Sequence, residues 1–289
     1  MKVLVVGAGG QLGLELRETA PAGVDLTTLG RHLLDITDGL ALRQTVAELR
    51  PDIILNAAAY TAVDKAEQER ETAFAINAKG AAHLAMLAQE NRIRLVHVST
   101  DFIFDGRRGS PYPTDAPPNP LGVYGASKLE GERLVREILG PEALILRTAW
   151  VYSSFGNNFV KTMLRLMRER SSLGVVADQV GSPTWAKGLA SAIWKMVELS
   201  LTGTHHWTDA GVASWYDFAQ AIQEEALQRG LLQHLIPLHP ITTAMYPTPA
   251  TRPAYSVLDK TATWQALGYT ASHWRVALCN MLQRMGRHG

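Results

Sequence analysis

The chain opens with a short aliphatic run that leads directly into a glycine-rich turn, and no other feature constrains the fold as strongly. Val3 to Val6 is unbroken by any polar residue, which is typical of a strand buried on both faces of a parallel sheet. The run stops at Gly7, and a helix is expected from about Gln11. The sequence therefore predicts a strand, a tight turn and a helix in immediate succession.

The glycines of this turn fit a dinucleotide. Gly10 allows the backbone to approach a pyrophosphate, and Gly13 allows the helix to pack closely on the strand. The free N–H groups at the helix start favour negative charge. Gly7, Gly10 and Gly13 are thus a candidate cradle. Their spacing is GxxGxxG, and glycines at a strand end also serve plain chain reversal, so the turn is weak evidence by itself.

Short aliphatic strands alternate with helical stretches through the first half of the chain. Further strands are predicted at 25–29, at 52–61, where the strand runs into small residues, and at 95–100, and a long helical stretch is predicted from about 64 to 90. This alternation predicts an α/β fold with a Rossmann-type, doubly wound parallel sheet and ligands at the carboxyl ends of the strands. Gly7, Asn56 and Thr100 are expected at such ends.

The second half follows a looser pattern. Helices are expected at about 159–170, 187–199 and 215–229, with a short strand near 175–176 and a long Pro-rich loop at 237–253. We therefore expect a dinucleotide-binding domain at 1–150. Residues 151–289 should form mainly a smaller mixed α/β substrate-binding lobe, with some segments returning to the first domain.

The residue after the second strand bears on the type of cofactor. An acid often accepts the adenine ribose hydroxyls there, but this chain has Gly30-Arg31-His32. The guanidinium of Arg31 suits a 2′-phosphate, which favours NADPH and leaves NADH as an alternative. Arg31 can also be an ordinary solvated arginine. Asp35 and Ile36 are expected beside the adenine, although this stretch also fits a helix N-cap.

Tyr124 and Lys128 form a YxxxK pattern. Residues four apart lie on one face of a helix, and an ammonium beside a phenol should lower the phenol's pKa toward the range of a general acid. Thr100, at the end of a strand, should hydrogen-bond the substrate oxygen. These three residues are the candidate catalytic set for hydride transfer to or from a carbonyl. Taken alone, Tyr124 is better explained as a half-buried tyrosine at a helix start, and only its setting favours the catalytic interpretation.

These residues belong to longer stretches that resemble the extended short-chain dehydrogenase/reductases, and among them the dTDP-4-dehydrorhamnose reductases. The stretches span most of the chain: 10–13, 56–67, 99–106, 124–128, 147–152, 156–161, 178–184 and 250–253.

The resemblance implies NADPH-dependent reduction of the C4 ketone of dTDP-4-dehydro-β-L-rhamnose to dTDP-β-L-rhamnose. It implies cofactor contacts at Gly10, Gln11, Leu12, Asp35, Ile36, Ala59, Tyr60, Thr61, Tyr124 and Lys128, and substrate contacts at Thr100, Asp101 and Trp150. A nucleoside diphosphate sugar is anionic and bulky. We therefore expect Asn158, Lys161 and Arg252 to hold it, although Arg252 is also consistent with an ordinary surface arginine.

Other members of the class remain alternatives. Sugar-nucleotide 4,6-dehydratases carry an Asp-Glu pair after the threonine, but here Asp101 is followed by Phe102. Epimerases share YxxxK but retain NAD, which Arg31 disfavours. The regulatory subunit of methionine adenosyltransferase is similar to these reductases without being catalytic. Intact Thr100, Tyr124 and Lys128 favour the enzyme.

Composition excludes several other functions. The net charge is +1 with both signs interspersed, so no basic field is expected to attract nucleic acid or an anionic membrane. The single cysteine permits no internal disulfide, and neither a signal peptide nor an 18-residue apolar run is present. We expect a cytoplasmic enzyme, with a homodimer as an open alternative.

No metal site is predicted. Neighbouring histidines on a strand, such as His205 and His206, point to opposite faces, so a shared ion with Asp209 is improbable. Some members of the resembled family are associated with Mg²⁺ at a subunit contact. Glu15 can take part in such a site, although no carboxylate cluster in the sequence demands one. Trp194, Trp215, Trp264 and Trp274 are expected in the core or in lobe contacts, with Trp150 as the exception.

Overall fold

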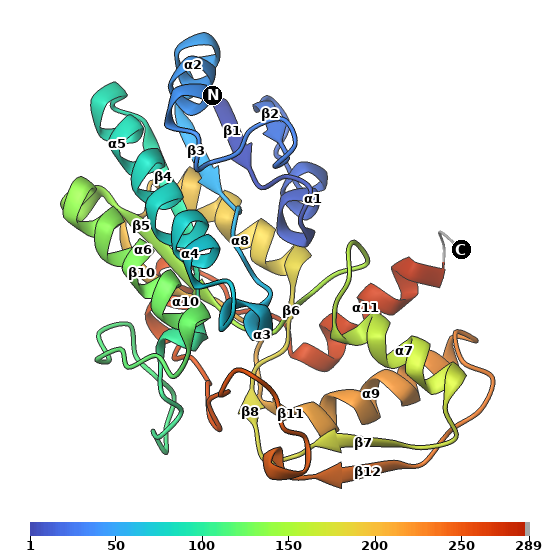
Figure 1. Cartoon of the computed structure of the whole chain (residues 1–289). Helices are drawn as coiled ribbons and strands as arrows, with labels where there is room; N and C mark the ends of the chain where they lie inside the picture. The colour runs from blue at the N-terminus through green and yellow to red at the C-terminus, as the bar shows by residue number, and fades with distance from the viewer. Residues whose placement is uncertain (287–289) are drawn as a thin grey trace.

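The centre of the molecule is a six-stranded parallel sheet. A computed structural model of the chain describes residues 1–286 (Figure 1). The strands lie in the order β10-β5-β4-β3-β1-β2. Their bounds are β1 Lys2–Val6, β2 Asp25–Leu29, β3 Ile53–Asn56, β4 Arg94–Thr100, β5 Leu144–Thr148 and β10 Gly203–His206. The order reverses between β1 and β3, which is where a doubly wound sheet binds its ligand. The predicted fold class is confirmed.

Helices cover both faces of this sheet, which explains why β1 is apolar from Val3 to Val6. Val3 and Val5 point into one core, together with residues of α1 (Gln11–Glu18), α8 (Ala186–Glu198) and α10 (Thr261–Leu267). Leu4 and Val6 point into the opposite core with α2 (Gly39–Leu49), α5 (Ala81–Asn91) and α6 (Val123–Leu139). Successive strand residues face opposite sides, so a strand covered on both faces has no polar position.

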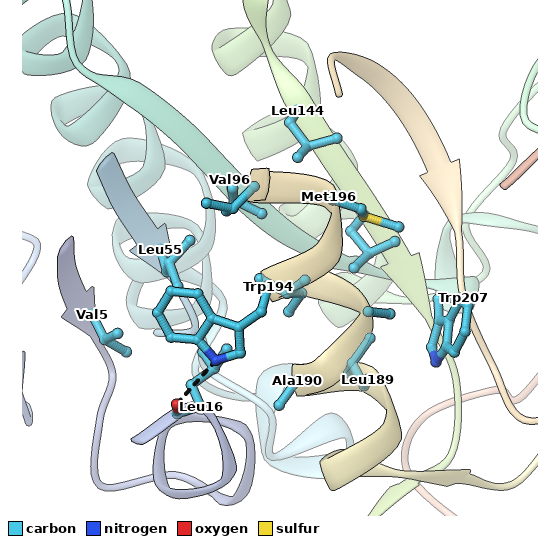
Figure 2. Packing of buried hydrophobic residues seen from close by; sticks show 14 of the residues in the cluster. Val5, Leu16, Leu55, Val96, Leu144, Leu189, Ala190, Trp194, Met196 and Trp207 are labelled. Atoms are coloured by element: carbon cyan, nitrogen blue, oxygen red, sulfur yellow. Dashed lines mark hydrogen bonds between the residues drawn. The ribbon is translucent and has the colours of Figure 1, made fainter. Parts of the chain in front are cut away.

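Helix α8 is the most apolar of these covers, although it comes from the second half of the chain. Leu189, Ile193 and Met196 are fully buried against the strands. Trp194 packs in the same core, and its indole N–H donates to Leu16 O of α1 at 3.1 Å (Figure 2). Segments after residue 151 therefore complete the sheet with β10 and cover one of its faces with α8 and α10.

The helical stretch predicted from 64 to 90 is divided in the structure. It contains α3 (Val63–Ala66), α4 (Arg70–Phe74), a π-helical turn (Ala75–Gly80) and α5. In the π-helical turn the Asn77 side chain accepts from Tyr60 N at 2.8 Å and donates to Ser127 Oγ at 2.9 Å. The turn thus ties the loop after β3 to helix α6.

The remaining elements form a second lobe with its own core. Helices α7 (Phe159–Glu169), α9 (Trp215–Gln228) and α11 (Trp274–Gly286) pack around Phe218 and Met281, with the parallel pair β7 (Leu173–Val176) and β12 (Leu238–Ile241) at the edge (Figure 1). Short pairs join β6 (Val151–Tyr152) to β9 (Thr184–Trp185) and β8 (Val180–Gly181) to β11 (Ala213–Ser214). Within residues 1–286 no helix is long and apolar enough to cross a membrane. The end of the predicted 151–289 lobe lies outside the described residues.

Candidate active site

A cavity of about 820 Å³ lies where the carboxyl ends of β1, β3 and β4 face the second lobe. Most of the site residues predicted from the sequence line it: Gly7, Gly10, Gln11, Leu12, Arg31, Asp35, Ile36, Ala59, Tyr60, Thr61, Thr100, Asp101, Tyr124, Lys128, Trp150, Asn158 and Arg252. Gly13 and Lys161 are outside the lining. One continuous space therefore joins the glycine turn, the YxxxK helix and the lobe.

The glycine turn has the shape that the sequence predicts. Gly7 has a φ of +78°, and a Cβ there would lie 2.4 Å from Ala58 N in the loop after β3. A Cβ at Gly13 would lie 2.5 Å from Ala8 Cα, so this glycine allows helix and strand to touch. Gly10 caps α1 without any side-chain hydrogen bond, and the space around Gly9 is open. The first turn of α1 is thus free to bind a diphosphate.

Arg31 lies at the rim of the cavity. Its side chain is 74% exposed, and its Nε is 3.5 Å from Asp35 Oδ2. Asp35 Oδ1 accepts from both the backbone and the hydroxyl of Thr37, and these bonds hold the pKa of Asp35 below its usual value. Asp38, rather than Asp35, caps α2. Asp35 is therefore not the N-cap of α2, and the ion-pair partner of Arg31 is Asp35, at a distance typical of a weak contact.

Tyr124 and Lys128 lie one helical turn apart at the start of α6. The Tyr124 ring packs edge-on against Phe102 with centroids 5.5 Å apart, and the Lys128 Nζ donates to Val98 O at 2.7 Å. A Cβ at Gly125 would lie 2.1 Å from Phe102 O. This glycine therefore lets α6 press against the turn that follows β4.

The prediction that Lys128 lowers the pKa of the Tyr124 phenol is wrong for this structure. Desolvation raises the pKa of Tyr124 to about 12, and a hydrogen bond with Thr100 opposes this to a smaller extent. Burial also lowers the pKa of Lys128 to about 8. The ammonium is held by the Val98 carbonyl, so desolvation decides the state of the phenol. Tyr124 is accordingly a proton donor at neutral pH.

Thr100 and Asp101 form a buried hydrogen-bonded pair beside the tyrosine. Thr100 Oγ1 donates to Asp101 Oδ1 at 3.1 Å and accepts from Phe102 N at 3.2 Å. Burial raises the pKa of Asp101 to about 6, and contacts with Ser256 and Thr100 oppose this to a smaller extent. The hydroxyl of Thr100 must turn away from Asp101 if it is to donate to a substrate oxygen.

Arg252 and Asn158 tie the second lobe to the first domain. The Arg252 guanidinium donates to both carboxylate oxygens of Asp64 in α3, at 3.0 and 2.7 Å. Asn158 caps α7 and donates to Gln11 Oε1 at 2.9 Å. Lys161 follows in the first turn of α7, where only its backbone N–H contacts Asn158. The structure thus gives Arg252 and Asn158 inter-lobe partners that the sequence did not predict.

Trp215 is a lining residue that sequence reasoning did not assign to the site. Its ring stacks on that of Trp150 with centroids 3.5 Å apart and planes 3° from parallel. The sequence carries no signal for this contact, because the helical period of α9 groups Trp215 with the core residues Phe218 and Ile222. The expectation that Trp215 is a core or lobe contact is incomplete.

The residues considered for a metal have other partners. Glu15 is fully buried, accepts from Ser153 Oγ at 2.6 Å and pairs with Arg284 at 2.9 Å. His206 is buried, whereas the His205 ring reaches Thr202 O near the surface. Between residues 1 and 286 no group of three or more His, Cys, Asp or Glu side chains is placed to hold a metal ion. Within the described chain Glu15 is thus paired with Arg284 and is not grouped with other carboxylates.

The fold and this cavity together define an oxidoreductase of the extended short-chain dehydrogenase/reductase class, with a glycine turn at one end and Tyr124 and Lys128 at the centre. The family model described as the RmlD substrate binding domain matches residues 1–287. The chain therefore belongs to this family.

Relatives and solved structures agree over nearly the whole chain. The dTDP-4-dehydrorhamnose reductase of Aggregatibacter actinomycetemcomitans is 43% identical over 97% of this chain and 98% of its own. The crystal structure of the dTDP-4-dehydrorhamnose reductase of Bacillus anthracis in complex with NADP is 39% identical, with a TM-score of 0.91 over 98% of this chain and 99% of that chain. A second crystal structure named as such a reductase, from Clostridium acetobutylicum, is 38% identical with a TM-score of 0.92 over 99% of both chains.

Proposed function

We propose that this protein is an NADPH-dependent reductase that converts dTDP-4-dehydro-β-L-rhamnose to dTDP-β-L-rhamnose. The observation that carries the proposal is the single cavity in which Tyr124, Lys128 and Thr100 lie between the glycine turn and Trp150. The names of the similar proteins and the NADP complex of one of them support it. The intact catalytic set in an open cavity favours an enzyme over a non-catalytic regulatory subunit.

The chemistry assigns one task to each residue. NADPH, when bound, supplies the hydride that reduces the C4 ketone. Tyr124, protonated at neutral pH because desolvation raises its pKa, gives its proton to the oxygen that becomes the C4 hydroxyl. The Thr100 hydroxyl, which donates to Asp101 in the free protein, turns to donate to the same substrate oxygen and orients it toward Tyr124. The proton consumed by the reaction returns to Tyr124 from solvent.

The residues at the cofactor end fit a phosphorylated dinucleotide. The open first turn of α1 suits the diphosphate, and Gly9 and Gly10 leave space for it. We assign the 2′-phosphate to Arg31, whose guanidinium is exposed at the cavity rim. Gln11, Leu12 and the loop residues Ala59 to Thr61 line the path between these two ends.

Substrate recognition is assigned to the lobe end of the cavity. We propose that Asp101 and Trp150 contact the hexose of the substrate, and that Arg252 and Asn158 lie along the diphosphate of the substrate. Lys161, outside the lining, is expected to act only through its charge. Binding energy from the remote diphosphate can orient the ketone, so a free keto sugar should react far more slowly.

The test supplies the dTDP-linked ketone, made in situ by the upstream dehydratase and epimerase, and follows both NADPH absorbance and product stereochemistry. The proposal expects NADPH oxidation that depends on the ketone and a rhamnose nucleotide as product. Absence of that product, or equal rates with the free keto sugar, contradicts it and favours the regulatory alternative.

We also propose that the protein works in the cytoplasm, since its single cysteine and its substrate suit a reducing compartment. A homodimer is the assembly we propose, to be tested by light scattering after size-exclusion chromatography.

A further inference from the structure

The backbone of Trp150 adopts an unusual conformation at the lobe end of the cavity. Its φ is +48°, in the left-handed region that bulky residues rarely occupy. The other non-glycine residues with positive φ within the described chain are Arg50, Arg92 and Ser200, each of which follows the end of a helix. Trp150 instead lies between strands β5 and β6. Surrounding contacts must therefore hold it in place.

Those contacts cover both faces of the indole. One face stacks on Trp215, with centroids 3.5 Å apart. A Cβ added to Gly181 would lie 2.5 Å from Cε2 of the Trp150 ring, so the Gly181 backbone lies close to this ring. No backbone fits between two rings stacked at 3.5 Å, so Gly181 must lie against the opposite face. Trp150 is enclosed between Trp215 and Gly181, and it meets the cavity with its edge.

The polar atom on that edge is free. The chain has 7 tryptophans. Three of them donate their indole N–H to acceptors, namely Trp194, Trp215 and Trp274. Three others have buried indole nitrogens without a partner, namely Trp185, Trp207 and Trp264. Trp150 falls in neither group, so among residues 1–286 its N–H is accessible and without a partner.

Trp215 is itself fixed from behind. Its N–H donates to Gln179 Oε1 at 3.2 Å, and Gln179 Nε2 donates to Thr243 Oγ1 at 3.1 Å. Phe159 packs against its ring at 4.6 Å. Gln179 is buried and lies outside the cavity lining, and its side chain contacts the site through Trp215.

We infer that Trp215 and Gly181 are positioning residues that hold Trp150 edge-on, so that its indole N–H donates to an oxygen of the bound hexose. This rests on the proposed function. A platform that stacks on a sugar needs an open ring face, and this ring has none. An indole N–H held in one direction instead selects substrates by the position of one sugar oxygen. The contacts of Trp215 and Gly181 with Trp150 therefore determine specificity for the sugar half of the substrate.

The test compares Trp150→Phe, Trp215→Phe and the double variant, with Trp185→Phe as the matched control from the same lobe core. Each single variant at the site should raise KM for the dTDP-linked ketone about 3- to 10-fold, the scale of one neutral hydrogen bond. KM for NADPH should stay within twofold. The double variant should match Trp150→Phe alone, because Trp215 acts through Trp150. The control should keep both KM values.

Additive effects in the double variant would make Trp215 an independent contact and overturn the inference. An unchanged KM for the ketone in Trp215→Phe would overturn it too. Gln179→Leu gives a second route that leaves the lining intact: it should raise the ketone KM alone, and equal effects on NADPH would contradict the positioning role.

The inference and the proposed function can fail separately. Urea unfolding of the same four proteins measures the coupling between the two rings without any substrate. No turnover by the wild type would remove the proposed function, whereas coupling with an unchanged ketone KM would remove only the inference. Zero coupling would remove the stacked pair on which the inference depends.

Discussion

Replacing Tyr124 by phenylalanine separates the chemistry of this residue from its packing. The variant keeps the ring that meets Phe102 edge-on with centroids 5.5 Å apart, and it removes only the hydroxyl. Loss of a general acid typically lowers the rate by about 10²- to 10⁴-fold, which corresponds to roughly 3 to 5 kcal/mol in the activation barrier.

The same change should hardly affect folding. The hydroxyl makes one hydrogen bond with Thr100, and a neutral hydrogen bond contributes about 0.5 to 1.5 kcal/mol net. Removing the hydroxyl also removes the cost of its desolvation, so the net change in unfolding free energy should be below about 1 kcal/mol. The expected result is therefore an inactive but stable protein.

The assay measures kcat by NADPH absorbance, NADPH affinity by fluorescence titration, and unfolding free energy in urea. Turnover should fall by at least about 100-fold while NADPH affinity stays within about threefold. Wild-type turnover in Tyr124→Phe would refute the assignment of the proton donor. An equal loss of stability would instead show that the hydroxyl is structural.

Three further predictions concern the cofactor, the helix and pH. Arg31→Ala should raise KM for NADPH about tenfold and leave NADH nearly unchanged, because the 74% exposed guanidinium makes a screened contact with the 2′-phosphate; equal losses for both cofactors would exclude that contact. Gly125→Ala should lower the unfolding free energy by about 1 to 3 kcal/mol in urea, since its Cβ would lie 2.1 Å from Phe102 O, whereas Gly109→Ala, with no atom within 4 Å, should be neutral. Reductase activity should fall as pH rises through about 8, because burial lowers the pKa of Lys128 to about 8 and the ammonium that we assign to the cofactor contact is charged only below that pH; a flat profile between pH 7 and 10 would contradict this.

The parts of this fold that depend on local pattern could be predicted from the sequence. Strand β2 occupies the predicted residues 25–29, and α7 begins at the predicted Phe159, because apolar period and helix capping are properties of neighbouring residues. The glycine turn was predictable for the same reason. Gly13 is required by a contact with Ala8 in the preceding turn, whereas the contact of Gly7 with Ala58 is distant in sequence.

The contacts that decide the chemistry of the site are distant in sequence, and no local pattern encodes them. Lys128 bonds to Val98, and Arg252 bonds to Asp64. The pKa of Tyr124 depends on the desolvation of its hydroxyl by burial, which the sequence spacing to Lys128 does not reveal. The sequence thus indicated the residues of the site, whereas their partners and protonation states required the fold.

The position of α8 has a consequence for the order in which the ribosome delivers this chain. By residue 150 the strands β1 to β5 have been made, but the face that Leu189 and Ile193 cover is still bare. The edge strand β10 and the Trp194 bond to Leu16 also arrive later. An emerging nascent chain therefore displays an uncovered apolar sheet for the time needed to synthesise about 50 more residues, which at 5 to 20 residues per second is several seconds. A truncated 1–150 fragment should share this exposure permanently, so it is expected to aggregate or to engage chaperones rather than to fold as an independent domain.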